Sequence, residues 1–350
     1  MHISHQLINW YQEHHRNLPW RQTKDPYKIW LSEIILQQTR VDQGTGYYYR
    51  FIEEFPEIEN LAKADEQTVL RLWQGLGYYS RARNLHKTAQ AIVNEYNGKF
   101  PANFEHLLSL KGIGDYTASA IASHAFGIPK AVVDGNVFRF LARYFSISEP
   151  INTSKGQKYF KNLAEELLDK ENPSLHNQAI MEFGALQCKP KNPDCKSCPF
   201  INNCQAFSHH KVDILPVKKR KTKVRNRFFN YFIVQNASKK ILLKKRTAKD
   251  VWHNLYDFPM LETERQIAEK ELLNGNQIEH LFDVKNYSIK EILPTQIHLL
   301  SHQKLHIRFI VIDFADYAVH ADFKAYSSKE IGKLPLPRPI EQFLSRFLHK

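Results

Sequence analysis

Cysteine is scarce in this chain of 350 residues, which has four cysteines in all, every one of them between positions 188 and 204. No apolar run approaches the roughly 20 residues that a transmembrane helix needs, and residues 1–15 lack the apolar core of a signal peptide. Internal repeats and low-complexity segments are also lacking. We therefore expect a cytoplasmic, nucleoid-associated protein with no membrane partner, in a reducing compartment where clustered thiols bind metal and form no disulfides.

Acidic residues are outnumbered, because 36 Asp and Glu stand against 49 Lys and Arg and leave a formal net charge of +13. Such an excess suits a polyanionic partner, with nucleic acid the first candidate and an anionic membrane surface the second. The hydrophobic content of 43% and the charged content of 24% are ordinary for a globular protein. The length of the chain favours two domains over one.

A predicted helix near the N-terminus carries one carboxyl group among apolar residues. Asp25 and Pro26 fit the N-cap and the first helical position, and the helix after them is apolar nearly all round apart from Glu33. Burial raises the pKa of a carboxyl group, which is the state that a general acid needs near neutral pH. Helical spacing places Trp30 and Gln37 on the face of Glu33, so this face would stack on, protonate and hydrogen-bond a flat polar ligand. The alternative is a core helix whose glutamate turns outward or pairs with an arginine.

Asp134 is the second candidate carboxyl group. It precedes a predicted helix through Phe140, and we expect it to be the N-cap of that helix, held ionised by backbone N–H groups and the helix dipole. One carboxyl group kept protonated by burial and another kept ionised at a helix end are the pattern of an acid and a cation stabiliser in glycosidic bond cleavage. The alternative is a helix cap with no further role.

A turn at residues 75–83 combines two glycines with tyrosine and arginine. On a nucleic-acid surface Tyr78 would wedge into the base stack while Arg81 holds a phosphate. A plain glycine turn with its tyrosines packed inward is the alternative.

A second glycine pair lies between predicted helices at 104–110 and 116–125. Gly112 and Gly114 predict a hairpin whose backbone N–H groups point toward the start of the next helix, a geometry that grips a phosphate. A simple turn between two helices is the alternative.

The cysteines follow the spacing C-x6-C-x2-C-x5-C in a short basic loop and are Cys188, Cys195, Cys198 and Cys204. Four thiolates suit a [4Fe–4S] cluster or zinc. The spacing alone does not exclude zinc, although the paired C-x2-C arrangement of many zinc sites is absent.

The character of the chain changes after the cysteine loop. Seven of the ten residues 218–227 are Lys or Arg, which predicts an exposed basic linker near or across DNA, or a solvated tether. Strand-like patterns follow at 228–235, 240–245 and 306–314, with helices between them such as Glu262–Leu273. These patterns predict a second domain of the α+β class.

A polar turn at residues 300–304 lies between strand-like runs. It would present Ser301 and His302 to the edge of a base, or it is an ordinary polar hairpin.

Together these motifs resemble the adenine DNA glycosylases of the MutY type, in the helix-hairpin-helix superfamily of base-excision repair, over nearly the whole chain. The resemblance is carried by Trp30–Thr39, Gly75–Asn84, the hairpin Gly112–Gly114, Val133–Val137 and the cysteine spacing. It implies an all-α helix-hairpin-helix glycosylase domain with an iron–sulfur loop, followed by an α+β Nudix-like domain. The implied bounds are 1–211 for the first domain with its loop at 188–204, 212–227 for the basic linker and 228–350 for the second domain. The resemblance also implies a [4Fe–4S] cluster in place of zinc.

The implied activity is that of a monomeric, monofunctional glycosylase that removes adenine opposite 8-oxoguanine or guanine in double-stranded DNA. Glu33 is implied to protonate a flipped-out adenine and then to help water attack, and Asp134 to stabilise the sugar cation. Tyr116 stands where lyase-active relatives carry a nucleophilic lysine, so no Schiff base is expected. Tyr116 and Asn136 would hold the sugar and Asp134.

The resemblance also implies residues that contact DNA. Those matching the adenine pocket are Trp20 and Arg21, and those matching positions that read the lesion strand are Gln37, Gln38 and Tyr78. Ser301 and His302 fall where the Nudix-like domain meets 8-oxoguanine, with Leu300 where relatives often carry phenylalanine. The glutamate-rich signature of Nudix hydrolases is missing, and residues 252–256 replace the glycine-rich stretch before it, which argues against nucleotide hydrolysis.

Three rival functions follow from parts of the pattern. A bifunctional glycosylase-lyase of the endonuclease III type fits the first domain but disagrees with Tyr116 and with the second domain. A non-catalytic iron–sulfur module that only flags mismatches is the second rival, and a nucleotide-pool hydrolase is the third.

Overall fold

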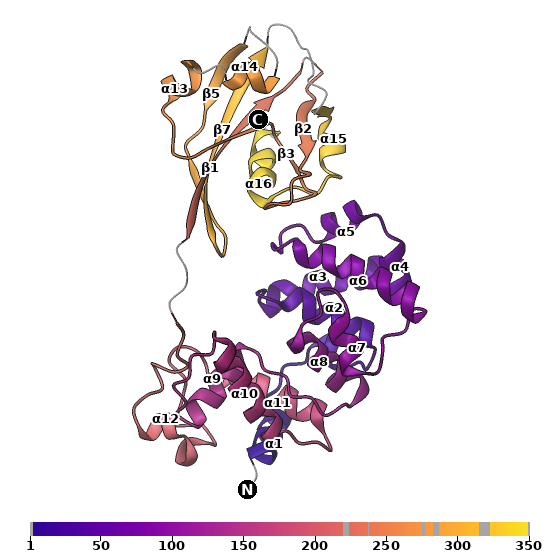
Figure 1. The fold of residues 1–350 in the computed structure, drawn as a ribbon, viewed down its shortest axis with the longest axis vertical. Helices are drawn as coiled ribbons and strands as arrows, with labels where there is room; N and C mark the ends of the chain where they lie inside the picture. The colour runs from indigo at the N-terminus through magenta and orange to yellow at the C-terminus, as the bar shows by residue number, and fades with distance from the viewer. Residues whose placement is uncertain are drawn as a thin grey trace. The chain divides into compact units, whose positions relative to one another are not determined.

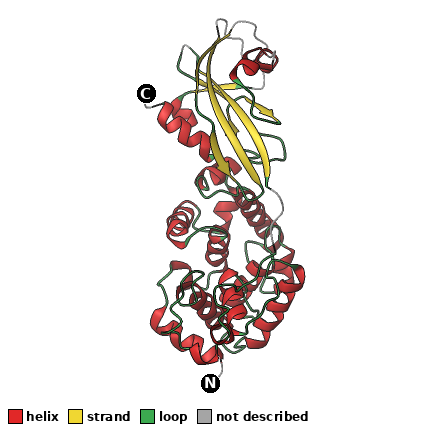
Figure 2. Ribbon diagram, turned by 90° about the vertical axis from the view of Figure 1, so that its left-hand side faces the viewer, coloured by secondary structure: helices red, strands yellow, loops and turns green. Residues whose placement is uncertain are grey.

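The computed structural model describes residues 3–219, 224–236, 238–274, 277–282, 287–314 and 323–348. It divides into two compact units. The helical unit comprises Met1–Ala64 and Arg83–Arg220, and the sheet unit comprises Asp65–Ala82 and Lys221–Lys350. Within the described ranges, strands occur only in the sheet unit (Figure 2). No described helix has the length and apolar character to cross a membrane. Residues 220–223 of the basic linker lie outside the described residues, and the domain bounds given above stay a prediction.

The helical unit is built from α-helices and two short 3₁₀ turns. Its elements are α1 (Ile3–His14), η1 (Pro19–Arg21), α2 (Pro26–Leu36), α3 (Val41–Glu54), α4 (Ile58–Lys63), α6 (Ser80–Tyr96), α7 (Phe104–Ser109), α8 (Asp115–Phe126), α9 (Gly135–Tyr144), α10 (Ser154–Leu167), α11 (Pro173–Leu186), η2 (Ile201–Asn203) and α12 (Gln205–Ser208). Residues 80–82 at the start of α6 belong to the sheet unit. Helices α1, α9, α10 and α11 gather in one half of the unit, whereas α2, α3, α7 and α8 gather in the other (Figure 1). The two halves meet where α11 packs against α8.

Helix α2 begins where the sequence predicts. The Asp25 carboxylate accepts a hydrogen bond from the backbone N–H of Tyr27, and Pro26 occupies the first turn, where its missing N–H costs nothing. The helix is buried along most of its length and packs against α8 and α3. A carboxyl group on this helix is therefore taken out of water by the fold itself.

The helix-hairpin-helix is formed by α7, α8 and the turn between them. The two helices lie within one residue of their predicted bounds. Gly112 has φ +82°, a left-handed conformation that side chains rarely adopt, and Gly114 is the N-cap of α8. Ile113 is buried beneath the turn while both glycines are exposed, so the backbone of the hairpin faces solvent.

The sheet unit holds helix α5 (Glu66–Leu72) and two sheets. Its strands are β1 (Arg225–Val234), β2 (Ile241–Lys245), β3 (Tyr256–Asp257), β4 (Met260–Thr263), β5 (Tyr287–Ile292), β6 (Gln296–Leu299), β7 (Gln303–Phe314) and β8 (Lys324–Tyr326). The larger sheet has the order β4-β1-β7-β5 with β6 paired to β7, and the smaller has the order β3-β2-β8. Helices α13 (Glu269–Asn274), α14 (Gln277–Phe282), α15 (Ser328–Ile331) and α16 (Arg338–Phe347) complete the unit. Strands β1 and β7 are parallel, with Arg227 opposite Leu305.

The predicted strands at 228–235, 240–245 and 306–314 are confirmed as β1, β2 and β7, and the α+β class is confirmed with them. The predicted helix Glu262–Leu273 is wrong over its first half. Glu262 lies in β4, paired with Phe229 of β1, and its carboxylate binds Arg227. Helix begins only at Glu269, because the strand pairing and the ion pair hold the preceding residues extended.

Candidate active site

A cavity of about 500 Å³ opens within the helical unit, and its walls come from both halves of that unit. All four residues predicted to be catalytic line this cavity. They are Glu33 on α2, Tyr116 on α8, Asp134 before α9 and Asn136 in the first turn of α9. The structure therefore brings the two candidate carboxyl groups to one cavity.

Glu33 is buried at this cavity, with only 9% of the residue exposed. Its pKa is raised to about 7, chiefly by burial and also by the nearby carboxyl group of Asp134, while a hydrogen bond with Tyr116 and the charge of Arg21 act in the opposite direction. The predicted burial and its consequence for the pKa are confirmed. Close to pH 7, a substantial fraction of Glu33 carries the proton that a general acid must donate.

Asp134 is the N-cap of α9, as predicted. Its Oδ1 accepts hydrogen bonds from the backbone N–H groups of Asn136 (2.9 Å) and Val137 (2.8 Å), and its Oδ2 accepts one from Asn136 Nδ2 (2.6 Å). The sequence predicts that these bonds hold the carboxyl group ionised, but its pKa is raised, because the cost of burial outweighs the cap bonds and the charge of Arg139. Both carboxyl groups therefore lack solvation for their negative charge, which favours a cation placed between them.

Tyr116 completes this end of the cavity. Its hydroxyl is buried beside Glu33 and Asp134, and burial together with these two acids raises its pKa well above the usual range, so it stays neutral. Among the described residues that line the cavity there is no lysine. The cavity thus offers acids and a neutral hydroxyl but no amine that would attack a sugar.

The lining of the cavity also includes an ion cluster, of which the sequence indicates only Arg21. Glu182 of α11, 1% exposed at its side chain, accepts hydrogen bonds from Arg16 Nη2 (2.7 Å) and Arg21 Nη2 (2.8 Å). Burial opposes its ionisation, but the two arginines together lower its pKa to about 2. Arg21 was predicted from the resemblance, whereas Arg16 and Glu182 were missed. The signal was present, since Glu182 is a lone acid in the apolar helix 173–186, the same feature that marks Glu33.

The two predicted tryptophans have different fates. Trp20 lines the cavity and packs edge-on against Tyr48. Trp30 does not line it, because the side chain is 1% exposed and packs edge-on against Phe100. The prediction that Trp30 stacks on a ligand beside Glu33 is therefore wrong. Residues three apart on a helix are offset by roughly 60° around its axis, and that offset turns the ring into the core.

Gln37 and Gln38 both lie at the cavity, at the end of α2. Gln37 Nε2 donates to Thr117 Oγ1 (3.4 Å). Gln38 has φ +57°, a left-handed conformation unusual for a residue other than glycine. Such local strain is common where a side chain must project into a ligand.

Tyr78 and Arg81 belong to the sheet unit. The Tyr78 ring is 43% exposed, its backbone has φ +49°, and its hydroxyl is 2.8 Å from Ser301 Oγ. Arg81 is buried, with its guanidinium over the rings of Trp73 and Tyr78, so the expectation that it holds a phosphate is wrong. The guanidinium group of Arg81 therefore packs against the ring of Tyr78. His302 is exposed next to Ser301, in the turn between β6 and β7.

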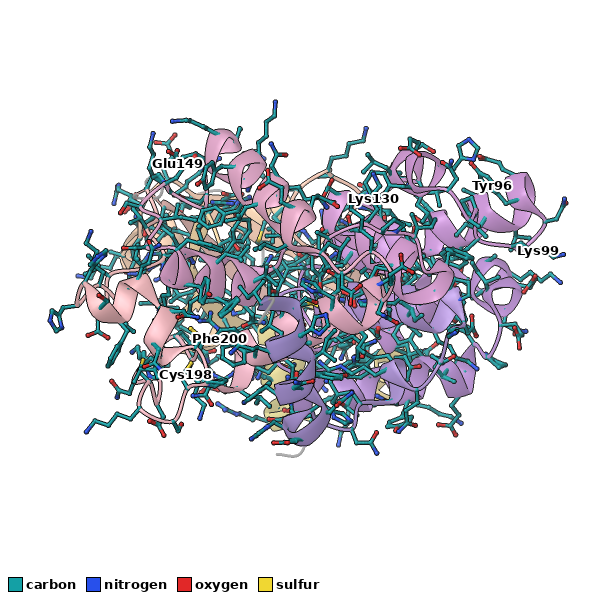
Figure 3. The ribbon with its side chains drawn as sticks, turned by 90° about the horizontal axis from the view of Figure 1, so that it is seen from below. Tyr96, Lys99, Lys130, Glu149, Cys198 and Phe200 are labelled. Carbon is teal, nitrogen blue, oxygen red and sulfur yellow. The ribbon has the colours of Figure 1, made fainter. Side chains whose placement is uncertain are left out.

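The four cysteines are free thiols and line a small cavity beside α9 and α11. The pKa of the Cys198 thiol is raised to about 12, chiefly by burial and also by the neighbouring Cys188 and Cys204. Arg143 Nη1 lies 3.4 Å from Cys188 Sγ and supplies positive charge at the site. Figure 3 shows Cys198 and Phe200 on this loop.

Four cysteine side chains are a donor set that zinc and a [4Fe–4S] cluster both accept. A tetrahedral zinc ion with Zn–S bonds of about 2.3 Å draws its four sulfurs together around a single point. Within the part of the chain that the structure describes, no three His, Cys, Asp or Glu side chains are grouped to hold one ion. The four cysteines line one small cavity, and the guanidinium group of Arg143 lies beside it. This arrangement suits a cluster in which each iron takes one thiolate.

Arg139 connects the cysteine loop to the acid at the cavity. Its Nη2 donates to Asn136 Oδ1 (2.9 Å), and its Nε donates to the carbonyl oxygen of Cys188 (2.7 Å). Asn136 in turn donates to Asp134. Two side chains therefore link the first cysteine of the loop to Asp134.

Comparison with known sequences shows two family matches. Residues 31–169 match the HhH-GPD superfamily of base excision DNA repair proteins, and residues 230–346 match the NUDIX domain. The adenine DNA glycosylase of Buchnera aphidicola subsp. Schizaphis graminum is 36% identical, over 99% of this chain and 98% of that protein. The adenine DNA glycosylase of Homo sapiens is 42% identical, over 57% of this chain and 38% of that protein.

Solved structures resemble the helical part. A thermostable thymine-DNA glycosylase aligns with a TM-score of 0.55 and 30% identity, covering 59% of this chain and 95% of that one. Endonuclease III in a non-covalent complex with DNA aligns with a TM-score of 0.52 and 23% identity, covering 59% of this chain and 94% of that one. The second likeness concerns the fold alone.

Proposed function

Because the chain belongs to the adenine DNA glycosylases and is therefore a hydrolase of N-glycosyl bonds, we propose that it excises adenine paired with 8-oxoguanine or guanine in double-stranded DNA. The observation that carries this proposal is the placement of Glu33 and Asp134 in one cavity. A glycosidic bond inside a base stack is inaccessible, so adenine has to leave the duplex and enter that cavity.

Glu33 supplies the proton that makes adenine a leaving group. With a pKa of about 7 it is protonated in part at neutral pH and strong enough to give the proton to a ring nitrogen. The C–N bond then breaks, its electron pair stays with the base, and neutral adenine departs. The sugar is left as an oxocarbenium-like cation.

Asp134 stabilises that cation. Its carboxyl group is fixed by three hydrogen bonds from Asn136 and Val137, so it does not have to reorganise as the charge develops. Burial removes the water that would solvate the Asp134 carboxylate. Once the sugar cation forms, its positive charge stabilises that carboxylate instead. The Glu33 carboxylate then takes a proton from water as the water oxygen bonds to the sugar carbon.

The wall formed by Arg16, Arg21 and Glu182 suits the edge of the base. The Glu182 carboxylate is ionised and already accepts four hydrogen bonds from Arg16 and Arg21. It therefore holds the two guanidinium groups in place, and these donate to ring nitrogens of adenine.

The absence of a lysine from the described lining of the cavity supports a monofunctional enzyme. Tyr116, at the position of the nucleophile in lyase-active relatives, is held neutral and does not form a Schiff base. The product is then an abasic site in an uncut strand.

Recognition of the opposite base is proposed for the turn of the sheet unit and for the neighbouring tyrosine. Adenine is a normal base, so only its partner marks the error. Ser301, His302 and Tyr78 are exposed, and the first and last are hydrogen-bonded to each other. A ring that enters the stack beside a hydroxyl that reads a base edge suits this task. Gln37 and Gln38 are proposed to contact the lesion strand from the end of α2.

The cysteines are proposed to hold a [4Fe–4S] cluster through Cys188, Cys195, Cys198 and Cys204. Bound there, the cluster would tie the loop 188–204 to the end of α9 and supply structural rigidity. The sequence of chemical steps above runs through the side chains of the chain itself.

The test uses a labelled duplex with adenine opposite 8-oxoguanine, and a control duplex with adenine opposite thymine. Strand scission after hot alkali, without scission in its absence and without scission of the control duplex, is the expected result. Glu33→Gln abolishes it while binding to DNA is retained, because the amide cannot give up a proton. Glu53→Gln, at an exposed position of α3, is the matched control and keeps full activity.

Two outcomes would contradict the proposal. Nicking without alkali would reveal a lyase nucleophile, as in an endonuclease III-type enzyme. If the wild-type chain binds DNA but gives no scission even after alkali, the protein is a module that only flags mismatches.

A further inference from the structure

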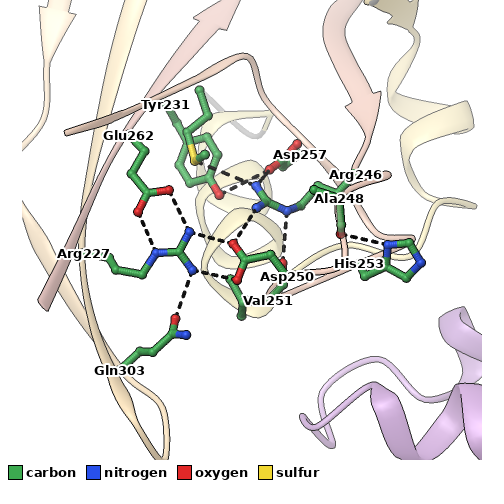
Figure 4. Close-up of polar contacts among 11 residues, drawn as sticks. Arg227, Tyr231, Arg246, Ala248, Asp250, Val251, His253, Asp257, Glu262 and Gln303 are labelled. Atoms are coloured by element: carbon green, nitrogen blue, oxygen red, sulfur yellow. Dashed lines mark hydrogen bonds and ion pairs between the residues drawn. The ribbon is translucent and has the colours of Figure 1, made fainter. Parts of the chain in front are cut away.

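Arg227 near the start of β1 is the centre of a buried ion network (Figure 4). A guanidinium group has five N–H donors, and here all are used. Nε and Nη2 bind Glu262 (2.6 and 2.7 Å), and Nη1 and Nη2 bind Asp250 (2.8 and 2.6 Å). The fifth bond runs from Nη1 to Gln303 Oε1 (3.1 Å). A lysine has three donors on one nitrogen and cannot reproduce this geometry.

The partners of Arg227 come from three other segments of the sheet unit. Glu262 lies in β4, Asp250 lies in the loop between β2 and β3, and Gln303 is the first residue of β7. Arg246 extends the network, because it binds Asp257 (2.6 Å) and approaches Asp250 (3.6 Å). The network is therefore far more than a pair at the surface, and its guanidinium groups are nearly dry.

Gln303 is the residue at which this network meets the proposed recognition turn. Its carbonyl oxygen accepts from the N–H of Leu300 (2.8 Å) and closes the turn, while the carbonyl oxygen of His302 accepts from the N–H of Arg225 (3.0 Å). The backbone of the turn is thus closed by two bonds, and the side chain of Gln303 is fixed by Arg227. Ser301 is the exposed residue between these anchors, and its hydroxyl meets Tyr78.

We propose that Arg227 is a positioning residue for opposite-base recognition: through Gln303 it fixes the turn 300–302 in the conformation in which Ser301 and Tyr78 meet the base opposite adenine. The proposal rests on the proposed function, since it deepens the role given there to that turn. Arg227 itself touches no DNA, because its donors are all engaged inside the sheet unit.

The same loop that supplies Asp250 also holds the tyrosine segment. Asn254 donates a hydrogen bond to Glu66 of α5, and the carbonyl oxygen of Asn254 accepts one from Gln67 Nε2 (3.4 Å). Asp250 and Asn254 therefore connect Arg227 to the segment 65–82 that carries Tyr78. Arg227 reaches both partners of the Tyr78–Ser301 contact, one through Gln303 and the other through this loop.

The test compares three variants of the full chain. Gln303→Met keeps the length of the side chain and removes only the acceptor for Arg227, so it leaves the arginine–carboxylate network in place. Arg227→Lys disrupts the network itself. Arg265→Lys is the matched control, because Arg265 binds Glu271 in an exposed pair of the same unit.

The primary readout is the ratio of kcat/KM for adenine opposite 8-oxoguanine to that for adenine opposite guanine. We expect the ratio to fall about tenfold in Gln303→Met and in Arg227→Lys, the effect of one charge-assisted hydrogen bond, while the rate of excision at saturating enzyme on the 8-oxoguanine duplex stays unchanged. A fourth chain that carries both Gln303→Met and Arg227→Lys should lose no more discrimination than Arg227→Lys alone, because Gln303→Met removes a contact that Arg227→Lys already breaks. Arg265→Lys should keep the wild-type ratio.

A second readout does not depend on excision. The affinity for an uncleavable duplex with an abasic analogue opposite 8-oxoguanine, relative to the same duplex with guanine, should fall in parallel with the kinetic ratio. If Arg227→Lys fails to fold, as judged by its melting curve, Gln303→Met decides the test by itself.

The outcomes separate this proposal from the proposed function. A wild-type chain that excises adenine and discriminates, with an unchanged ratio in Gln303→Met, overturns the positioning role and leaves the function intact. A ratio lowered equally in Arg265→Lys overturns it as well. A wild-type chain that excises adenine from neither duplex overturns the proposed function, and the affinity comparison still decides the role of Arg227.

Discussion

Single residues show how the fold gives two buried carboxyl groups of one cavity, Glu33 and Glu182, different charges. Glu33 has a neighbouring acid and a tyrosine but no directly bound cation, so burial raises its pKa to about 7. Glu182 is as well buried at its side chain, but two arginines bind it and lower its pKa to about 2. The chemistry of each group is therefore set by whether a guanidinium group reaches it. Burial alone does not decide it.

The pH dependence of excision should follow Glu33. The acid form declines as the pH rises through about 7, so the single-turnover rate should fall with a midpoint near that pH. The measurement is the rate at saturating enzyme between pH 5.5 and 9 on the 8-oxoguanine duplex. A rate that rises across this range would show that an ionised base, and not an acid, limits the reaction.

The stability of the chain should improve when Glu33 loses its charge. A carboxyl group whose pKa is raised on folding binds more protons in the folded state, so the free energy of unfolding falls as the pH rises from about 4.5 to about 7. Glu33→Gln does not titrate, and the folded state should gain on the order of 3 kcal/mol over wild type above pH 7 and little near pH 4.5. Thermal melts of both chains at pH 5 and pH 8 measure this difference. An equal or larger gain at the lower pH would refute the assignment.

At this scale the sequence predicted what local pattern determines. A lone acid in an apolar helix, and an aspartate before a helix, were enough for Glu33 and for the cap role of Asp134. The ion cluster at Glu182 was missed because its arginines lie more than 160 residues away along the chain. Trp30 was misplaced because spacing gives the face of a helix only to within a side-chain width, and the tertiary contact with Phe100 turned the ring inward.

Among the elements, the hairpin between α7 and α8 depends most on one residue type. Gly112 has φ +82°, and a Cβ atom there would lie 2.7 Å from the Cβ of Asn84. Gly112→Ala should therefore cost about 1–3 kcal/mol of unfolding free energy, from backbone strain and from the clash. A thermal melt measures the loss.

Gly46→Ala is the control for this substitution. Gly46 lies within α3, and a Cβ atom at this position would have no neighbouring atom within 4 Å. Alanine there should therefore stabilise the chain by up to about 1 kcal/mol through its higher helix propensity. Destabilisation of equal size at both positions would show that the special geometry of the hairpin is not responsible.

The cysteine loop is the element whose fold should depend on a ligand. Burial raises the pKa values of Cys188 and Cys198, so water does not stabilise their thiolate forms. Iron would stabilise these thiolates by binding them, next to the positive charge of Arg143. We expect purified protein to be brown, to absorb near about 400 nm and to contain about four irons per chain. Cys198→Ser should lose most of that iron and lower the melting temperature, whereas Ser197→Ala in the same loop should keep both. Zinc in a colourless protein of equal stability would contradict the assignment.

Elements were predicted well where pattern and capping agree, as in α2, α7, α8, β1 and β7. The region 262–273 failed for a physical reason: its helical periodicity was overruled by the pairing of β4 with β1 and by the bond of Glu262 to Arg227. A contact between residues 35 positions apart decides the structure there, and no local pattern reports it.

For the whole molecule, the path of the chain is the feature that the sequence does not reveal. The chain leaves the helical unit after Ala64, contributes residues 65–82 to the sheet unit and returns. Tyr78 is therefore grouped with Ser301 although 223 positions separate them. Hydrophobic periodicity predicts each helix but does not say to which unit the helix belongs. Composition and motif order therefore predicted two domains, but they did not predict that residues 65–82 join the second one.

The net charge of +13 belongs to the molecule as a whole and should govern binding before any base is read. Neutralising about five phosphates would lower log K by about 4.5 per tenfold rise in salt concentration. We therefore expect affinity for an undamaged duplex to fall steeply between low and moderate salt, and KM for the mispaired duplex to rise in step. The rate of excision at saturating enzyme should change little, because the carboxyl groups of the cavity are buried and weakly screened. Fluorescence anisotropy and single-turnover kinetics over the same salt series measure the two quantities. Equal loss of affinity and rate would mean that surface charge also shapes the catalytic cavity, and a flat affinity would remove electrostatics as the basis of DNA binding.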